Sequence, residues 1–213
     1  MKKIKYILIV SFLLISTYSF AGVDFGADVV SRYIWRGMDF GNSVSVQPFL
    51  SASVGGFEAG AWASYPFSND AIGANENDLY VSYSVGPVSF LVTDYYYPEG
   101  LKFGDYSDDG SHVIEGAVSA SFGPVGLIGA VNAYGDSDHS IYFEATYEFY
   151  SKDDLSVGTT LGAGNKAYIS DPSGDPNIVV LGISASKGNL SASYIINPEM
   201  DTNYLVFGYS IGL

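Results

Sequence analysis

The chain has 213 residues with 23 acidic and only 9 basic side chains, for a formal net charge of −14. Charged residues make up 15% of the chain and aromatic residues another 15%, whereas soluble domains average roughly 25% charged residues. The acidic excess argues against nucleic-acid binding, because phosphate contacts need Lys and Arg. The absence of cysteine excludes disulfides, thiolate metal sites and thiol catalysis.

The first 21 residues have the three parts of a secretory signal peptide. Three lysines precede an apolar run over residues 7–15, and Ser19-Phe20-Ala21 fits a small-x-small cleavage site. An uncleaved anchor is the alternative, but the apolar run is shorter than the roughly 20 residues that a spanning helix needs. We therefore predict export through the Sec pathway and cleavage after residue 21. Residues 22–213 then form one domain with a net charge of 6 − 23 = −17.

Apolar and polar residues alternate along the predicted mature chain in segments of about ten residues. Period-two alternation indicates strands with two different faces, and this segment length suits strands that cross an apolar layer at a tilt. The pattern predicts an all-β fold, an antiparallel up-and-down transmembrane β-barrel. Its twelve expected strands are 23–35, 44–54, 57–67, 78–85, 88–97, 112–122, 125–134, 139–149, 155–163, 177–186, 189–197 and 203–213.

The predicted connections alternate between short turns and longer polar loops, as in outer-membrane barrels, where turns face the periplasm and loops face outward. An even number of strands places both ends of the barrel domain on the periplasmic side. The predicted tight turns are Gly55-Gly56, Gly86-Pro87, Gly123-Pro124, Ser151 to Asp154 and Lys187-Gly188, and the long loops are 36–43, 67–77, 98–111 and 164–176.

Apolar residues of one parity are expected to face lipid. A two-sheet sandwich would give the same pattern within one strand, but here aromatic residues gather toward both ends of the strands, as at the two interfaces of a bilayer. The predicted aromatic girdle comprises Phe25, Trp35, Phe57, Tyr65, Phe90, Tyr96, Phe122, Phe149, Tyr194 and Tyr209.

Residues of the opposite parity are expected to line the lumen. Four of them are spaced four residues apart along the first predicted strand and so share one face of it. They form a predicted ladder in which two acids lie below two arginines, namely Asp24, Asp28, Arg32 and Arg36. The whole set is acidic on balance, which would favour cations in an open lumen. The alternative is that these groups pair with one another and close the barrel, and twelve strands do not decide between the two. The predicted lining comprises Asp24, Asp28, Arg32, Arg36, Gln47, Glu58, Glu115, Asn132, Glu144 and Glu148.

The segment Ser31-Arg32-Tyr33-Ile34-Trp35-Arg36-Gly37 resembles the hallmark of a proteobacterial family, the TorF-like porins, also called the Gcw_chp family. The resemblance continues through Gln47-Pro48 and the small-residue strand from Ala59 to Tyr65. It implies an outer-membrane barrel with porin activity, but no particular solute. The chain departs from the resemblance in its terminal Leu213 and in its acidity.

The sequence thus predicts a porin in the cell outer membrane that passes small polar solutes or cations. The alternative is a closed barrel that acts through its outer loops. An enzyme is not expected, since only His112 and His139 could supply an imidazole base. The predicted partners are outer-membrane lipid, lipopolysaccharide and, through the last strand, the barrel-assembly machinery. No cofactor is expected, and the acidic loops lack the spacing of an EF-hand metal site.

Overall fold

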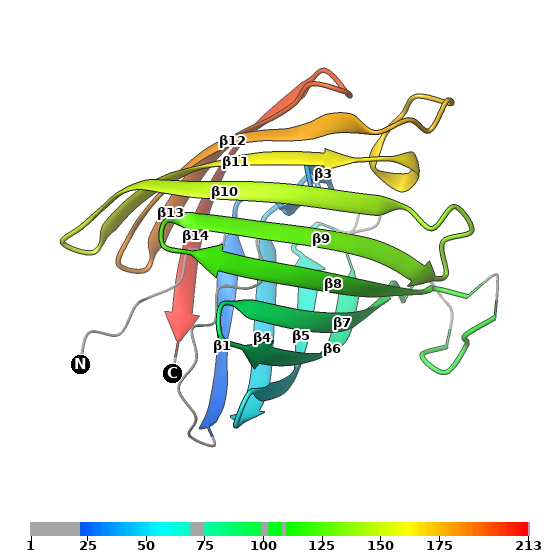
Figure 1. Ribbon diagram of the computed structural model, residues 1–213, viewed down its shortest axis with the longest axis horizontal. Coiled ribbons are helices and arrows are strands. Elements are labelled where there is room, and N and C mark those ends of the chain that lie inside the picture. The colour runs from blue at the N-terminus through cyan, green and yellow to red at the C-terminus, as the bar shows by residue number, and fades with distance from the viewer. Residues whose placement is uncertain (1–21, 69–74, 99–101, 108–109, 213) are drawn as a thin grey trace.

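The computed structural model describes residues 22–68, 75–98, 102–107 and 110–212. It is a closed barrel of twelve antiparallel strands, which confirms the predicted fold class (Figure 1). The predicted signal peptide and Leu213 lie outside the described residues, as do parts of the predicted loops 67–77 and 98–111. The barrel strands are β1 (Gly22–Val30), β4 (Ser45–Val54), β5 (Phe57–Pro66), β6 (Glu76–Val85), β7 (Val88–Tyr96), β8 (His112–Phe122), β9 (Val125–Tyr134), β10 (Ile141–Lys152), β11 (Leu155–Gly164), β12 (Asn177–Lys187), β13 (Leu190–Asn197) and β14 (Thr202–Gly212).

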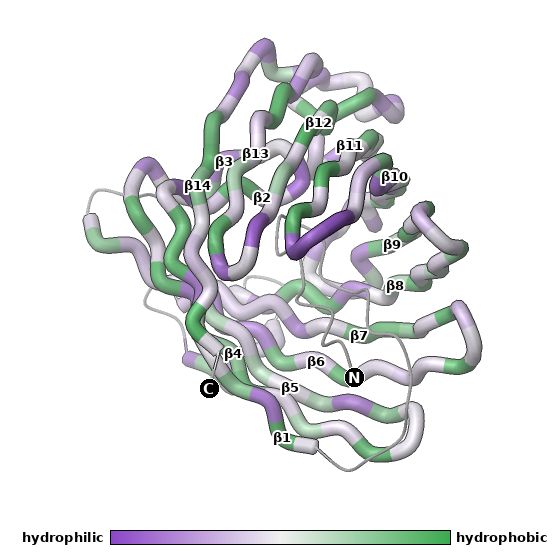
Figure 2. Tube along the Cα trace, turned by 90° about the vertical axis from the view of Figure 1, so that its left-hand side faces the viewer, coloured by the Kyte–Doolittle hydropathy of each residue, from purple (hydrophilic) through white to green (hydrophobic). Residues whose placement is uncertain are grey.

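Each strand pairs with its neighbours in the chain, and β1 closes the barrel by pairing with both β4 and β14. Opposite faces of one strand differ in polarity, and hydropathy alternates along the strands in Figure 2. In β14, for example, Leu205, Phe207 and Tyr209 are exposed on the outside, whereas the intervening side chains are less exposed. The outer surface is therefore apolar, as the parity of the sequence predicts.

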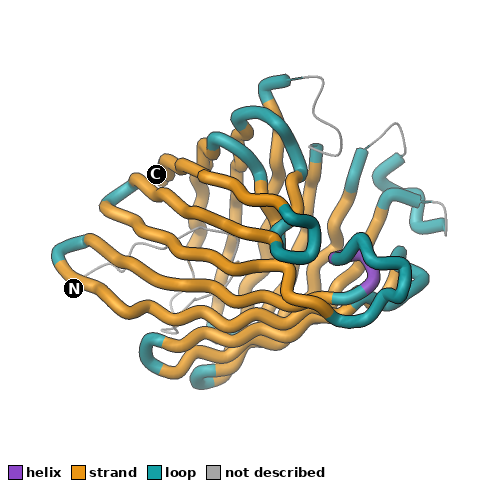
Figure 3. The backbone as a smooth tube through the Cα atoms, turned by 90° about the horizontal axis from the view of Figure 1, so that it is seen from above, coloured by secondary structure: helices purple, strands orange, loops and turns teal. Residues whose placement is uncertain are grey.

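Tight turns lie at one end of the barrel and longer loops at the other, which we call the turn end and the loop end (Figure 3). Four turns begin with a glycine at positive φ, and the β10–β11 turn uses Asp153 and Asp154 at φ 51° and 61°. Positive φ at the first turn position suits the twist of a hairpin. All five turns were predicted; the four glycines are Gly55, Gly86, Gly123 and Gly188.

The first predicted strand is wrong beyond Val30. Residues 32–43, which we call the lumenal hairpin, leave the barrel wall and include the short strands β2 (Ile34–Trp35) and β3 (Met38–Asp39). Arg36 and Gly37 form the turn between them, at φ 50° and 80°. This is a two-residue hairpin turn with glycine in its second position. The hairpin lies inside the barrel.

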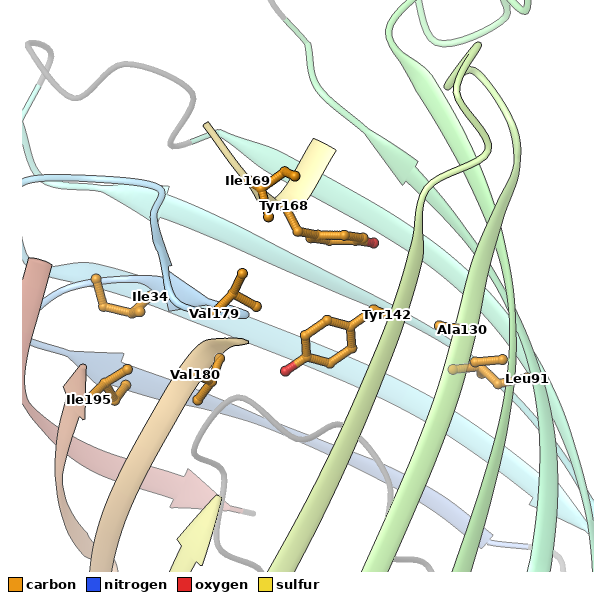
Figure 4. Close-up of a cluster of buried hydrophobic side chains, with 10 residues drawn as sticks. Ile34, Leu91, Ala130, Tyr142, Tyr168, Ile169, Val179, Val180 and Ile195 are labelled. Carbon is orange, nitrogen blue, oxygen red and sulfur yellow. The ribbon is translucent and has the colours of Figure 1, made fainter. Parts of the chain in front are cut away.

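An apolar cluster of buried side chains lies around the lumenal hairpin (Figure 4). Ile34 of the lumenal hairpin packs there with Val179, Val180 and Ile195 of the wall. Tyr168 joins them from the 3-10 helix η1 (Lys166–Tyr168) in the loop between β11 and β12. These side chains are nearly inaccessible to solvent, so the hairpin is anchored by burial of apolar surface as well as by polar contacts.

The loop between β9 and β10 is organised by Asp136. Its carboxylate accepts hydrogen bonds from Asn132 Nδ2 at 2.9 Å and from the backbone N–H groups of Asp138 and Ser140, each at 3.0 Å. Burial alone would raise the pKa of this carboxyl, but the donated hydrogen bonds together hold its pKa below the ordinary range of aspartate.

We expect Asp136 to stabilise the folded protein at neutral pH. Because the pKa of Asp136 is lower in the folded than in the unfolded state, its contribution is present above the unfolded-state pKa and is lost as pH falls through the folded-state pKa. Asp136→Asn should lower the unfolding temperature at pH 7. The difference from the wild type should shrink as both are titrated below about pH 4. A difference that persists undiminished at pH 2 would contradict the assignment.

Candidate functional site

The lumenal hairpin is held to the barrel wall by a buried ion pair. Arg36 at its turn donates from Nη1 to Glu115 Oε2 at 2.5 Å and from Nη2 to Glu115 Oε1 at 2.9 Å. Both side chains are almost completely buried, with 6% and 1% of their surfaces exposed. A guanidinium and a carboxylate joined by two parallel hydrogen bonds have a fixed orientation. The pair therefore sets where the hairpin lies in the lumen.

Aromatic residues surround this ion pair. Arg36 Cζ lies 4.4 Å from the ring centre of Trp35 and 4.3 Å from that of Tyr142. The hydroxyl of Tyr95 donates to Glu115 at 3.1 Å, and Arg36 also donates to the Tyr168 hydroxyl at 2.6 Å. Cation–π contacts and additional hydrogen bonds compensate the desolvation of buried charges.

The backbone of the hairpin comes close to the wall at Gly37. A Cβ atom at this position would lie 2.1 Å from the carbonyl oxygen of Val179. The Gly37 carbonyl accepts a hydrogen bond from Asn197 Nδ2 at 3.2 Å. Both its positive φ and this contact require glycine.

Burial raises the pKa of Tyr168 to about 12, with Arg36 lowering it and Glu115 raising it. The tyrosine hydroxyl therefore stays protonated at neutral pH. It can accept from Arg36 while it donates in turn to Glu115, 3.5 Å away. The ion pair and the tyrosine form one hydrogen-bonded network across the lumen.

The structure brings only part of the predicted lumen lining together. Glu115 and Arg36 meet directly, and Asn132 and Glu144 are buried in the same half of the barrel. Asp28 and Gln47 are buried opposite each other on β1 and β4. The remaining wall acids lie toward the turn end and are more exposed; they are Asp24, Glu58 and Glu148.

The predicted ladder of two acids and two arginines along one strand is wrong, because β1 ends before either arginine. Arg32 lies in the lumenal hairpin, with Nε 3.0 Å from Asp39 Oδ2, and it also donates to Asn42. Arg36 reaches across the lumen to Glu115 instead of standing above Asp28. Both arginines remain inside the barrel, but their charges are already matched by acids.

The predicted position of Trp35 in the aromatic girdle is also wrong. Trp35 belongs to the lumenal hairpin, and its ring centre lies 5.5 Å from that of Tyr95 and 5.8 Å from that of Tyr168. Tyr96 has the expected outward parity, but it is only 8% exposed because it stacks on His112 and contacts Phe103. The other girdle residues are exposed, namely Phe25, Phe57, Tyr65, Phe90, Phe122, Phe149, Tyr194 and Tyr209.

The placement of the tryptophans gives a direct spectroscopic prediction. Trp35 and Trp62 are the two tryptophans of the chain, and both line the lumen. In bilayers that contain brominated lipids, we expect the tryptophan fluorescence of the reconstituted protein to be nearly unquenched. A Leu205→Trp variant in a Trp35→Phe, Trp62→Phe background, with its indole on the outer face, should be strongly quenched. Strong quenching of the wild type would contradict the lumenal position of Trp35.

A cavity of about 110 Å³ lies beside the lumenal hairpin in the middle of the barrel. Its walls include side chains of β5, β6 and β7 and, across the lumen, Ser193 and Ile195 of β13. Asp78 and Trp62 line it from paired positions on β6 and β5. The predicted lumen lining included neither residue, and the buried Glu76 was predicted to lie in an outer loop. The inward parity of Trp62 and Asp78 was the available indication.

The two histidines occupy different surroundings at the loop end. The ring of His112 has Nδ1 2.8 Å from Asp94 Oδ1 and Nε2 2.8 Å from the carbonyl oxygen of Phe103. His139 Nδ1 lies 3.1 Å from the carbonyl oxygen of Asn132. Neither imidazole has a serine hydroxyl among these contacts. Through its contact with the Phe103 carbonyl and its stacking on the Tyr106 ring, His112 connects residues 103–106 to the loop end of the barrel.

Within the described ranges, no three His, Asp or Glu side chains are grouped in a way that could hold a metal ion. The same residues contain no helix that is long and apolar enough to cross a membrane. The lumenal hairpin, the Arg36–Glu115 pair and the cavity lie together inside the barrel, and this region is the candidate functional site.

Comparison with known proteins gives one family and a distant structural likeness. No curated protein matches the chain. Two triple mutants of the Rh. blastica porin resemble it at 11% sequence identity. The first has a TM-score of 0.40 and covers 91% of this chain and 100% of the porin, and the second has a TM-score of 0.37 and covers 91% and 99%. The family model described as "bacterial protein of unknown function (Gcw_chp)" matches residues 13–205, and the chain therefore belongs to the Gcw_chp family.

Proposed function

We propose that this protein is an outer-membrane channel that passes small polar solutes and prefers cations, with the lumenal hairpin as its constriction. The observation that carries the proposal is a closed barrel with an apolar outer surface and buried acidic side chains inside, such as Asp28, Glu76 and Asp78. An apolar exterior on a sheet without edges suits a lipid environment. The resemblance to TorF-like porins points the same way.

The charge balance of the interior supports the preference for cations. Arg32 and Arg36 are each matched by an acid, Asp39 and Glu115. By contrast, the inward acids Asp28, Glu76 and Asp78 form no salt bridge with any cation in the described residues. Unmatched carboxylates along a narrow path attract cations and repel anions.

Planar-bilayer recording tests the proposal. Refolded protein should give discrete single-channel steps of low conductance, and in a gradient of KCl the reversal potential should have the sign of a cation-preferring pore. A well-folded protein without steps would contradict the proposal. A reversal potential with the sign of an anion-preferring pore would contradict the preference for cations.

A closed barrel that acts through its outer loops is the second candidate function. It is favoured by one observation, the burial of the lumenal hairpin and its ion pair in the loop-end half of the lumen. In that case the wild type gives no conductance, and only variants without the hairpin conduct. Both candidate functions include the proposed outer-membrane location and the proposed contacts with lipid and lipopolysaccharide. Both also include recognition of the last strand by the barrel-assembly machinery.

A further inference from the structure

The cavity beside the lumenal hairpin contains buried polar atoms that no protein group satisfies. Asp78 is 7% exposed and Ser193 is 4% exposed, and both line the cavity. Neither Asp78 Oδ1 nor Ser193 Oγ has a hydrogen-bond partner among the described residues. A buried carboxylate oxygen without a donor is costly, so a site of this kind favours a ligand that donates hydrogen bonds.

The charges around the cavity indicate whether the ligand is a cation or an anion. One basic and one acidic side chain line the cavity, Arg32 and Asp78. The charge of Arg32 is matched by Asp39, whereas Asp78 has no cationic partner in the described part of the chain. Glu76, two residues before Asp78 on the same face of β6, adds a second buried oxygen without a partner. The local field therefore favours a cation.

Aromatic side chains around Asp78 distinguish an organic from an inorganic cation. Trp35, Trp62, Tyr80 and Tyr95 all line the same cavity. Aromatic rings attract ammonium groups and also pack against alkyl chains. A bare metal ion would instead need several oxygen ligands at short range, and the described residues contain no such group. A volume of about 110 Å³ limits the ligand to a few heavy atoms.

We infer that this cavity is a binding site for small organic cations with a primary ammonium group. The ammonium would donate to Asp78 Oδ1, and the alkyl part would lie against the rings of Trp62 and Tyr80. This site rests on the proposed channel function, for which it names the class of solute. The lumenal hairpin forms one wall of the site, so the solute would bind directly beside the constriction.

Intrinsic fluorescence tests the inference without any measurement of conductance, because both tryptophans of the chain line the cavity. Titration of folded protein in detergent with propylammonium chloride should give a saturable change in emission. The neutral 1-propanol and the anionic propionate should give no saturable change. Asp78→Asn should weaken propylammonium binding by at least about tenfold, because the asparagine oxygen can still accept a hydrogen bond but no longer carries a negative charge.

Asp153→Asn is the matched control, because it neutralises an exposed acid in the β10–β11 turn that does not line the cavity. It should bind propylammonium as the wild type does, and circular dichroism should show that both variants are folded. Equal responses to propylammonium and 1-propanol, or unchanged binding by folded Asp78→Asn protein, would overturn the inference. Saturable binding by a protein that gives no channel steps would retain the binding site and remove only the channel.

Discussion

Replacement of residues 32–42 by a short Gly-Ser linker is expected to raise single-channel conductance severalfold. The lumenal hairpin occupies the loop-end half of the barrel, where Ile34 packs against Val179 and Ile195 and Arg36 contacts Glu115. The wall strands pair with one another without the hairpin, so the barrel should still close. Removal of the hairpin leaves a lumen whose width is set by the twelve strands.

A shortened outer loop provides the control for this deletion. Residues 171–173 and 175 in the loop between β11 and β12 are exposed. Shortening this loop should leave the conductance close to that of the wild type. If the hairpin deletion folds but conducts no better than the wild type, the hairpin is not the constriction.

The second large effect is expected for Arg36→Met. This substitution leaves Glu115 buried, 1% exposed, without its cation. Removal of one partner from a buried ion pair typically destabilises a protein by about 3–5 kcal/mol. We expect a loss of this size in urea unfolding of the detergent-folded protein, together with frequent transitions to higher conductance as the hairpin loosens.

The double variant Arg36→Met, Glu115→Gln distinguishes the effect of breaking the ion pair from other effects of the substitutions on packing. Glutamine can still accept the hydrogen bond from Tyr95, and no unpaired charge remains buried. Most of the lost stability should therefore return. A double variant as unstable as the sum of its two single variants would show that Arg36 and Glu115 do not interact.

The barrel wall could be predicted from the sequence because its determinants are local. Alternating residues such as Leu205, Phe207 and Tyr209 assign each strand to two faces, and turn residues such as Gly55 mark where strands reverse. In an up-and-down barrel each strand pairs with its neighbours in the chain. The order of the strands then follows without long-range information.

The lumenal hairpin could not be predicted from alternation alone, because residues 31–36 continue the period-two pattern of β1. The pattern is the same whether Trp35 faces lipid or lies inside the barrel. One indication was present: Arg36-Gly37 separates two pairs of residues that can form strands, as in a two-residue hairpin turn. Placement inside the lumen depends on contacts with Glu115 and Val179, which are far away in the sequence.

The cavity, like the lumenal hairpin, could be predicted only in part from the sequence. The inward parity of Trp62 and Asp78 followed from the strand pattern, but their proximity to Ser193 and to the lumenal hairpin did not. The parity of a residue in its strand predicts which face its side chain occupies. It does not predict which side chains of other strands lie opposite it in the lumen. Glu76 was missed because the β6 strand begins two residues earlier than predicted.

A single-cysteine scan along β12 tests the central claim that one face of each strand contacts lipid and the other a water-filled lumen. The chain has no cysteine, so each introduced thiol is observed alone. In reconstituted bilayers, a charged water-soluble thiol reagent should modify cysteines at the inward positions 182, 184 and 186. Cysteines at the outward positions 181, 183 and 185 should stay unmodified until detergent is added. Equal reactivity at both sets of positions before detergent is added would contradict the account.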